Sequence, residues 1–133
     1  MKYLLDTNVC VDFLTGRYPN IASRIRDLSP SEICSSSIVV AELRYGADKS
    51  LRRTRNHQLL DILFDEIPAY DFDQEAASTY GKLRAHLEKK GALIGPNDML
   101  IAAHALSLGL VLVTDNVREF RRVRGLKVEN WRK

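Results

Sequence analysis

Short apolar runs alternate with longer amphipathic stretches along the chain, and the two patterns predict strands and helices in turn. The strands are expected at 3–5, 33–35 and 110–114, with an edge strand at 126–129. The helices are expected at 8–14, 20–28, 38–47, 51–64 and 73–90, and from the Gly95-Pro96-Asn97 turn to Leu108. Strands separated by helices pair in parallel through right-handed crossovers. The pattern therefore predicts an α/β fold with a central, mostly parallel sheet flanked by helices.

Two short polar residues are expected to begin helices at the ends of predicted strands. Asn8 is the predicted cap of the first helix and Ser37 that of the helix at 38–47, because such side chains accept hydrogen bonds from free amide groups. In parallel sheets, ligands bind outside the carboxyl ends of the strands, where the strand order reverses. Catalytic or ligand-binding residues are therefore expected at the carboxyl ends of the predicted strands.

Length and composition are those of one globular domain. The chain has 133 residues, of which 45% are hydrophobic and 28% charged, so we expect residues 1–133 to form a single domain. No apolar stretch is long enough to span a bilayer. Asp6 and Asp12 interrupt the first residues, so the uninterrupted apolar stretch of a signal peptide is not expected there. The isolated cysteines Cys10 and Cys34 suit a reducing compartment. These features predict a cytoplasmic protein without a membrane partner.

The net charge of +3 is unevenly distributed. From residue 116 onward, seven Lys and Arg residues stand against two Glu, whereas the rest of the chain is slightly acidic. A second cluster of basic residues lies within residues 49–55. Basic patches on an acidic body suit a polyanionic partner. The arginines expected to contact such a partner are Arg52, Arg53, Arg55, Arg118, Arg121 and Arg122.

Four carboxylates from separate segments are predicted to meet at one edge of the sheet. Asp6 and Asp115 directly follow predicted strands. Glu42 lies one turn after Ile38 in a stripe with Ala41 and Tyr45, and Asp98 lies one turn before the apolar row Ile101, Ala105 and Leu108. Four acids aimed at one rim would repel one another unless a cation neutralised them. Oxygen ligands without His or Cys suit Mg²⁺ or Mn²⁺, which points to phosphoryl chemistry.

Polar neighbours of these acids can orient them or hold water at an ion. Each is a short hydroxyl or amide side chain beside a predicted strand end: Thr7, Asn8, Ser37, Thr114 and Asn116. Groups of this kind commonly fix the geometry of metal-binding carboxylates.

Six short motifs occur in order along the chain: Leu4-Leu5-Asp6-Thr7-Asn8, Ser35-Ser36-Ser37-Ile38, Ala41-Glu42-Leu43, Gly95-Pro96-Asn97-Asp98, Val113-Thr114-Asp115-Asn116 and Arg118-Glu119-Phe120. In these motifs the sequence resembles PIN-domain ribonucleases of the VapC toxin type, and among them the initiator-tRNA-specific endonucleases. The resemblance implies a PIN-like three-layer sandwich. It also implies that Asp6 and Asp98 bind Mg²⁺, with Mn²⁺ as a substitute, that Glu42 completes the acidic set, and that Asp115 or Asn116 fills the fourth position.

The resemblance further implies a toxin of a type II toxin–antitoxin pair. Such an enzyme hydrolyses RNA, here the anticodon stem-loop of initiator tRNA, and leaves a 5′-phosphate and a 3′-hydroxyl. Its partners would be a VapB-type antitoxin, whose tail covers the active site, and a second copy of the chain.

Two other protein classes share part of this pattern. Haloacid-dehalogenase-like phosphatases and receiver domains also place an aspartate after the first strand, but they need Asp-x-Asp, or an acidic pair with a lysine after a later strand. Here the first site reads Asp6-Thr7-Asn8, and Lys127 follows a long arginine-rich segment. A non-catalytic RNA-binding PIN-like module would lack one of the acids, and all four are present.

Overall fold

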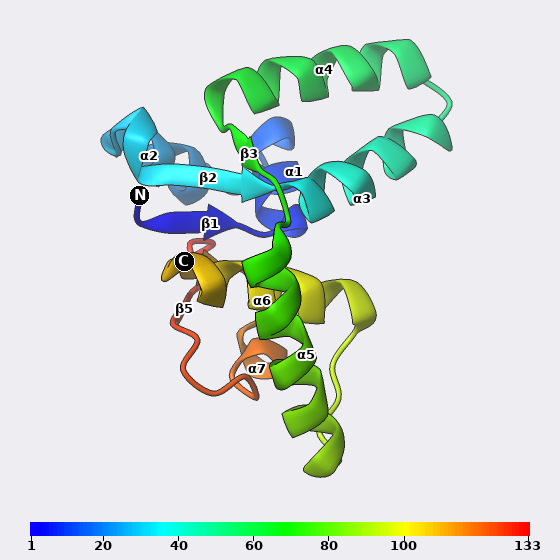
Figure 1. Ribbon diagram of the computed structural model, residues 1–133. Helices are drawn as coiled ribbons and strands as arrows, with labels where there is room; N and C mark the ends of the chain where they lie inside the picture. The colour runs from blue at the N-terminus through cyan, green and yellow to red at the C-terminus, as the bar shows by residue number, and fades with distance from the viewer.

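A computed structural model describes all residues from 1 to 133 and places five short strands in one sheet. The strands are β1 (Tyr3–Leu5), β2 (Ile33–Ser36), β3 (Ala69–Tyr70), β4 (Val111–Val113) and β5 (Val128–Glu129). Their order is β3-β2-β1-β4-β5 and every pairing is parallel. The parallel α/β architecture predicted from the pattern is thus confirmed (Figure 1).

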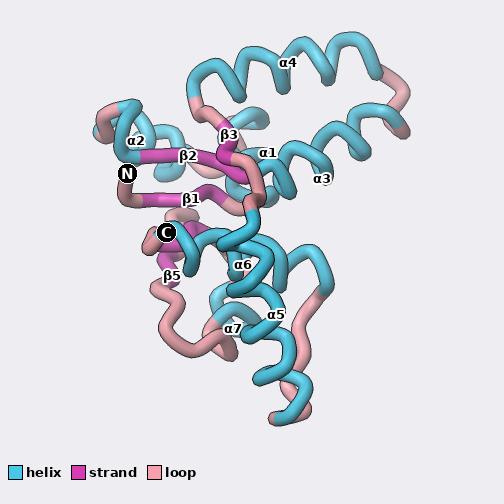
Figure 2. The backbone as a smooth tube through the Cα atoms, in the orientation of Figure 1, coloured by secondary structure: helices cyan, strands magenta, loops and turns pink.

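Seven α-helices flank the sheet. They are α1 (Thr7–Thr15), α2 (Pro19–Asp27), α3 (Ser37–Asp48), α4 (Arg53–Glu66), α5 (Gln74–Lys89), α6 (Pro96–Leu108) and α7 (Val117–Phe120). The α3 and α4 helices form an arm that projects from the sheet, whereas α5 packs against α6 on the other side of β1 (Figures 1 and 2). No helix of the structure is both long and apolar enough to cross a membrane.

The central strand β1 owes its position to an uninterrupted apolar run. Leu4 and Leu5 are fully buried on opposite faces of the sheet, which is the environment of a central parallel strand. β1 pairs with β2 on one side and β4 on the other, so the strand order reverses at β1. Asp6, the residue after β1, therefore stands at the switch point where ligands bind in such sheets.

Two predicted helix caps were wrong by one or two residues. Asp6, not Asn8, caps α1, because its extended backbone lets Oδ1 accept the amide of Thr7 at 2.7 Å. Ser36, not Ser37, caps α3, and its hydroxyl accepts the amide of Ile38 at 3.1 Å. Asp6 directly follows β1 and Ser36 is the last residue of β2, so each helix begins immediately after the residue that caps it.

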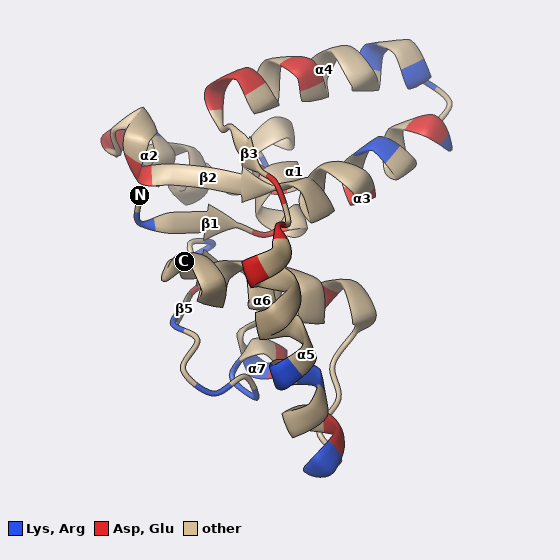
Figure 3. Ribbon diagram, in the orientation of Figure 1, with Lys and Arg blue, Asp and Glu red and all other residues tan.

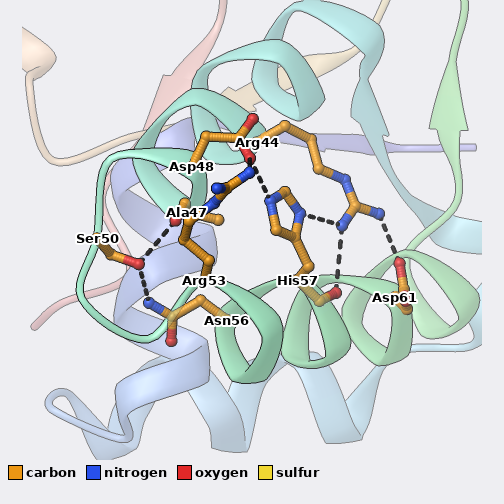
Figure 4. A network of polar contacts seen from close by, with 8 residues as sticks. All are labelled: Arg44, Ala47, Asp48, Ser50, Arg53, Asn56, His57 and Asp61. Carbon is orange, nitrogen blue, oxygen red and sulfur yellow. Dashed lines mark hydrogen bonds and ion pairs between the residues drawn. The ribbon is translucent and has the colours of Figure 1, made fainter.

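A polar network joins the two helices of the projecting arm (Figure 4). Arg44 on α3 donates to Nδ1 of His57 at 3.0 Å and to Asp61 at 2.7 Å, both on α4. The other ring nitrogen of His57 donates to Asp48 at 2.8 Å, and this hydrogen bond lowers the pKa of Asp48. Arg53 also pairs with Asp48, at 3.3 Å. The basic cluster of the arm is thus partly engaged within the arm itself.

Candidate active site

Asp6 forms the buried centre of the site. Its side chain is only 4% exposed, and its second oxygen accepts the hydroxyl of Thr114 at 2.7 Å. Burial raises the pKa of Asp6, and the charges of Glu42 and Asp115 raise it further, while the hydrogen bonds from Thr114 and Thr7 oppose the shift. The carboxylate is therefore held rigidly in a place where its ionised form is destabilised. A cation bound beside it would offset this destabilisation.

Glu42 reaches this centre from α3. One of its oxygens accepts the hydroxyl of Thr7 at 2.6 Å, and the other accepts the amide of Asn97 at 3.3 Å. The buried stripe of α3 consists of Val39, Leu43 and Ala47. The predicted stripe was wrong, because Tyr45 is 65% exposed and Ala41 is exposed too. Glu42 borders the true stripe next to Leu43, so it still points toward the sheet edge.

Asp98 lies in the first turn of α6, half-buried beside the other acids. Burial, the charge of Asp6, and the hydrogen bond and charge of Glu119 raise the pKa of Asp98 to about 7, with a smaller effect from Glu42. Gly95 leaves room for this carboxylate, because a Cβ atom there would lie 3.3 Å from Oδ2 of Asp98. The turn before α6 therefore forms a cradle that a larger residue would crowd.

Glu119 joins the site as an acid to which the sequence analysis assigned no role. Its Oε1 accepts the backbone amide of Gly95 at 2.8 Å and its Oε2 accepts the side chain of Asn116 at 2.6 Å. The Gly95 hydrogen bond lowers the pKa of Glu119, helped by those from Asn116 and Asp98. The available signal was the Arg118-Glu119-Phe120 motif of the family resemblance, whose Phe120 is fully buried.

Asp115 is the fourth predicted acid, and its charge is felt at Asp6. Its Oδ1 accepts the amide of Asn8 at 3.3 Å, and its Oδ2 forms an ion pair with Arg132 at 3.2 Å. The structure thus brings together all four predicted acids and adds Glu119 as a fifth, whose charge raises the pKa of Asp98.

The predicted supporting residues divide into two groups. Four of them contact the acidic residues directly through the hydrogen bonds already described: Thr7, Asn8, Thr114 and Asn116. Ser37 instead accepts the amide of Phe72 at 2.9 Å, so its hydroxyl ties α3 to the segment before α5.

The predicted RNA-contacting arginines lie in two regions (Figure 3). Arg118 and Arg122 line a hollow of about 400 Å³ beside Glu119. Arg55 lines a larger cavity of 720 Å³ that also includes Thr7 and Glu42. The remaining arginines are exposed at helix boundaries, Arg121 at the end of α7 and Arg52 and Arg53 at the start of α4.

Comparison with known proteins places this arrangement in a family, because the PIN domain model matches residues 3–126. The chain belongs to the PIN-domain family. The PIN domain is 42% identical to the tRNA(fMet)-specific endonuclease VapC of Salmonella typhimurium over 98% of both chains. It is also 42% identical to ribonuclease VapC2 of Rickettsia felis over the full length of both.

Solved structures agree with the sequence comparison. The PIN domain superimposes on DNA-bound VapBC from Salmonella typhimurium with a TM-score of 0.93 at 42% identity, covering 98% of each chain. It superimposes on VapBC2 from Rickettsia felis, bound to a promoter DNA fragment, with a TM-score of 0.91 at 41% identity, covering 98% of this chain and 99% of that one.

The donor set of the PIN domain fits a hard divalent cation. All its candidate ligands are carboxylate oxygens, and Mg²⁺ is commonly held by one or two carboxylates together with water and substrate phosphates. No group of three or more His, Cys, Asp and Glu side chains is arranged to hold a metal ion by itself. Asp6 and Asp98, both with raised pKa values, are the pair whose charge an ion would best compensate.

Proposed function

We propose that residues 1–133 form one nuclease domain, a Mg²⁺-dependent endoribonuclease that acts as the toxin of a VapBC-type pair in the cytoplasm. The observation that carries this proposal is the meeting of five acids, delivered by β1, α3, α6, the turn after β4 and α7, around the buried Asp6. The alternative of a dehalogenase-like or receiver-like domain receives no support, since the family match is to the PIN domain. A non-catalytic module is disfavoured because no acid is missing.

The residues divide the work of phosphodiester hydrolysis between them. Asp6 and Asp98 would hold the Mg²⁺ ion, or Mn²⁺ in its place. When bound, the ion would polarise an oxygen of the substrate phosphate and make a water molecule more acidic. Thr114 and the amide of Thr7 fix the Asp6 carboxylate from two sides. Glu42, fixed by Thr7 at 2.6 Å, is placed to accept the proton of the attacking water.

Initiator tRNA is the substrate that the comparisons favour. Relatives from Salmonella typhimurium and Shigella flexneri, 42% and 40% identical, are named tRNA(fMet)-specific endonucleases. Single-stranded loops are the usual targets of sequence-specific RNA recognition, so the anticodon stem-loop is the expected site. The solved relatives are VapBC complexes, and we therefore expect a VapB-type antitoxin as partner. The family resemblance further implies a homodimer of this chain.

The test is cleavage of purified bacterial tRNAs by the purified chain in Mg²⁺. We expect cuts in the anticodon stem-loop of initiator tRNA, mapped by primer extension, while elongator tRNAs stay intact. EDTA should stop the reaction and added Mg²⁺ should restore it. Equal cleavage of all tRNAs would contradict the substrate, and cleavage that persists in EDTA would contradict the metal.

The hollow beside Glu119 predicts a further result for RNA affinity. Replacing Arg118 and Arg122 by Gln should weaken binding and reduce its salt dependence by up to ~0.7 in log–log slope for each lost single-strand contact. The measurement is a titration of RNA with Asp6→Asn protein at several salt concentrations. Arg26→Gln, on the exposed face of α2, is the matched control. An unchanged slope would move the backbone contacts to Arg52, Arg53 and Arg55.

A further inference from the structure

The segment after β5 is anchored so that its side chains have fixed directions. Trp131 is 2% exposed and packs edge-on against the ring of Tyr3, with ring centroids 5.0 Å apart. Its indole N–H donates to Glu129 at 2.9 Å. The next amide, that of Arg132, donates to the side chain of Asn130 at 2.9 Å. Arg132 therefore leaves a rigid turn in a defined direction, back toward α1.

The guanidinium of Arg132 is locked onto a buried carboxylate. Its Nε donates to Asp12 at 2.7 Å and its Nη2 donates to the second oxygen of Asp12 at 3.2 Å. Asp12 lies on α1 and is 4% exposed. The ring of Tyr18 covers the guanidinium at 4.4 Å from Cζ. This two-pronged contact with a stacked ring fixes the plane of the guanidinium as well as its position.

The third nitrogen of the same group points at the acidic site. Nη1 of Arg132 lies 3.2 Å from Oδ2 of Asp115, whose other oxygen accepts the amide of Asn8. Both oxygens of Asp115 are thus held by protein groups. Asp115 in turn is close enough to Asp6 for its charge to be felt there.

We propose that Arg132 is a positioning residue of the active site: clamped by Asp12 and Tyr18, it holds Asp115 at the acidic rim and balances the charge of Asp115. This inference rests on the proposed ribonuclease function. It assigns a role to Asp12, Tyr18 and Arg132, which lie outside the set of acids that a family resemblance implies.

The geometry explains why the residue must be arginine. The planar guanidinium contacts two carboxylates at the same time. Two of its nitrogens bind Asp12, and the third pairs with Asp115. Lysine has a single nitrogen on a flexible stem and cannot reproduce this bridge. The Arg132→Lys variant therefore keeps a positive charge near the buried Asp12 but loses the hold on Asp115. Arg132→Ala is less informative, because it leaves Asp12 buried without a partner and can unfold the chain.

The experiment is a double-mutant cycle of Arg132→Lys and Asp115→Asn, with Lys133→Ala as the control at the adjacent exposed position. We expect Arg132→Lys to lower kcat for RNA cleavage about 10- to 100-fold, the usual effect of removing a group that orients an active-site carboxylate. KM should change little, and Lys133→Ala should have wild-type activity. In the Asp115→Asn background, Arg132→Lys should cause no further loss.

A second measurement reports on the contact without RNA or metal. The melting temperatures of the two single variants and the double variant should not be additive, because the two residues interact directly. Additive melting temperatures, or a loss of kcat that persists in the Asp115→Asn background, would overturn the positioning role. A wild-type chain that cleaves no RNA would refute the ribonuclease itself, and non-additive melting temperatures would then identify the pair as purely structural.

Discussion

Replacing Asp98 by Asn is expected to abolish RNA cleavage while leaving the fold intact. The substitution removes one of the two carboxylates assigned to Mg²⁺ and with it several kcal/mol of transition-state stabilisation, so the rate should fall by at least about 100-fold. The fold should survive because Asp98 is a charged group that burial and its acidic neighbours already disfavour, with a pKa raised to about 7. Single-turnover cleavage of tRNA and circular dichroism melts measure the two effects.

The matched control for this variant is Asp65→Asn, on the exposed surface of α4. It should cleave tRNA at the wild-type rate. Asp98→Asn protein that cleaves at the wild-type rate would remove Asp98 from the site. A melting temperature well below that of the wild type would instead show that Asp98 supports the fold.

The stability of the metal-free protein is expected to fall as the pH rises from about 4 to about 7. Asp98 has a pKa of about 7 in the folded chain against 3.8 as its ordinary value, so the folded state binds its proton more tightly than the unfolded state does. The stabilisation is complete below pH 3.8 and is lost as the pH rises through 7. Asp6 shifts in the same direction. Glu119 shifts the opposite way, and its contribution is lost only as the pH falls below its ordinary value of 4.5.

Mg²⁺ should reverse the loss of stability at high pH. An ion that binds only the folded chain stabilises it by RT ln(1 + [L]/Kd), about 2.7 kcal/mol at a hundred times Kd. The shift should be larger at pH 8 than at pH 5.5, because ionised carboxylates bind the ion and protonated ones do not. Thermal melts at both pH values, with and without Mg²⁺, measure it. A melting temperature that Mg²⁺ leaves unchanged at pH 8 would contradict the metal site.

The sequence predicted best what depends on neighbours along the chain. Asp6 directly follows the apolar run Leu4-Leu5, so its place at the carboxyl end of a central strand followed from local pattern alone. Glu42 was placed correctly from a wrong stripe, since α3 buries Val39 and Leu43 rather than Ala41 and Tyr45. When apolar residues occur on several faces of a helix, the sequence alone does not show which face packs on the sheet, because contacts with distant elements decide it.

The remaining parts of the site depend on contacts between distant segments. Glu119 lies on the four-residue helix α7, which is too short to produce a periodic pattern. The two-residue strand β3 escaped prediction for the same reason. In the sequence, Asp12 was only a charge that interrupts the apolar start of the chain, and the three-dimensional path of the chain shows that it is buried against Arg132. Such pairings leave no trace in local sequence.

The ion pair between Asp12 and Arg132 joins positions 120 residues apart in the chain. During synthesis, Asp6, Glu42 and Asp98 are therefore made, and can begin to fold, well before the segment that holds Asp115 emerges from the ribosome. With the positioning role proposed for Arg132, the enzyme would reach full activity only after its own translation has passed residue 132. A ribonuclease directed against translation would thus be kept incomplete for as long as the ribosome is still making it.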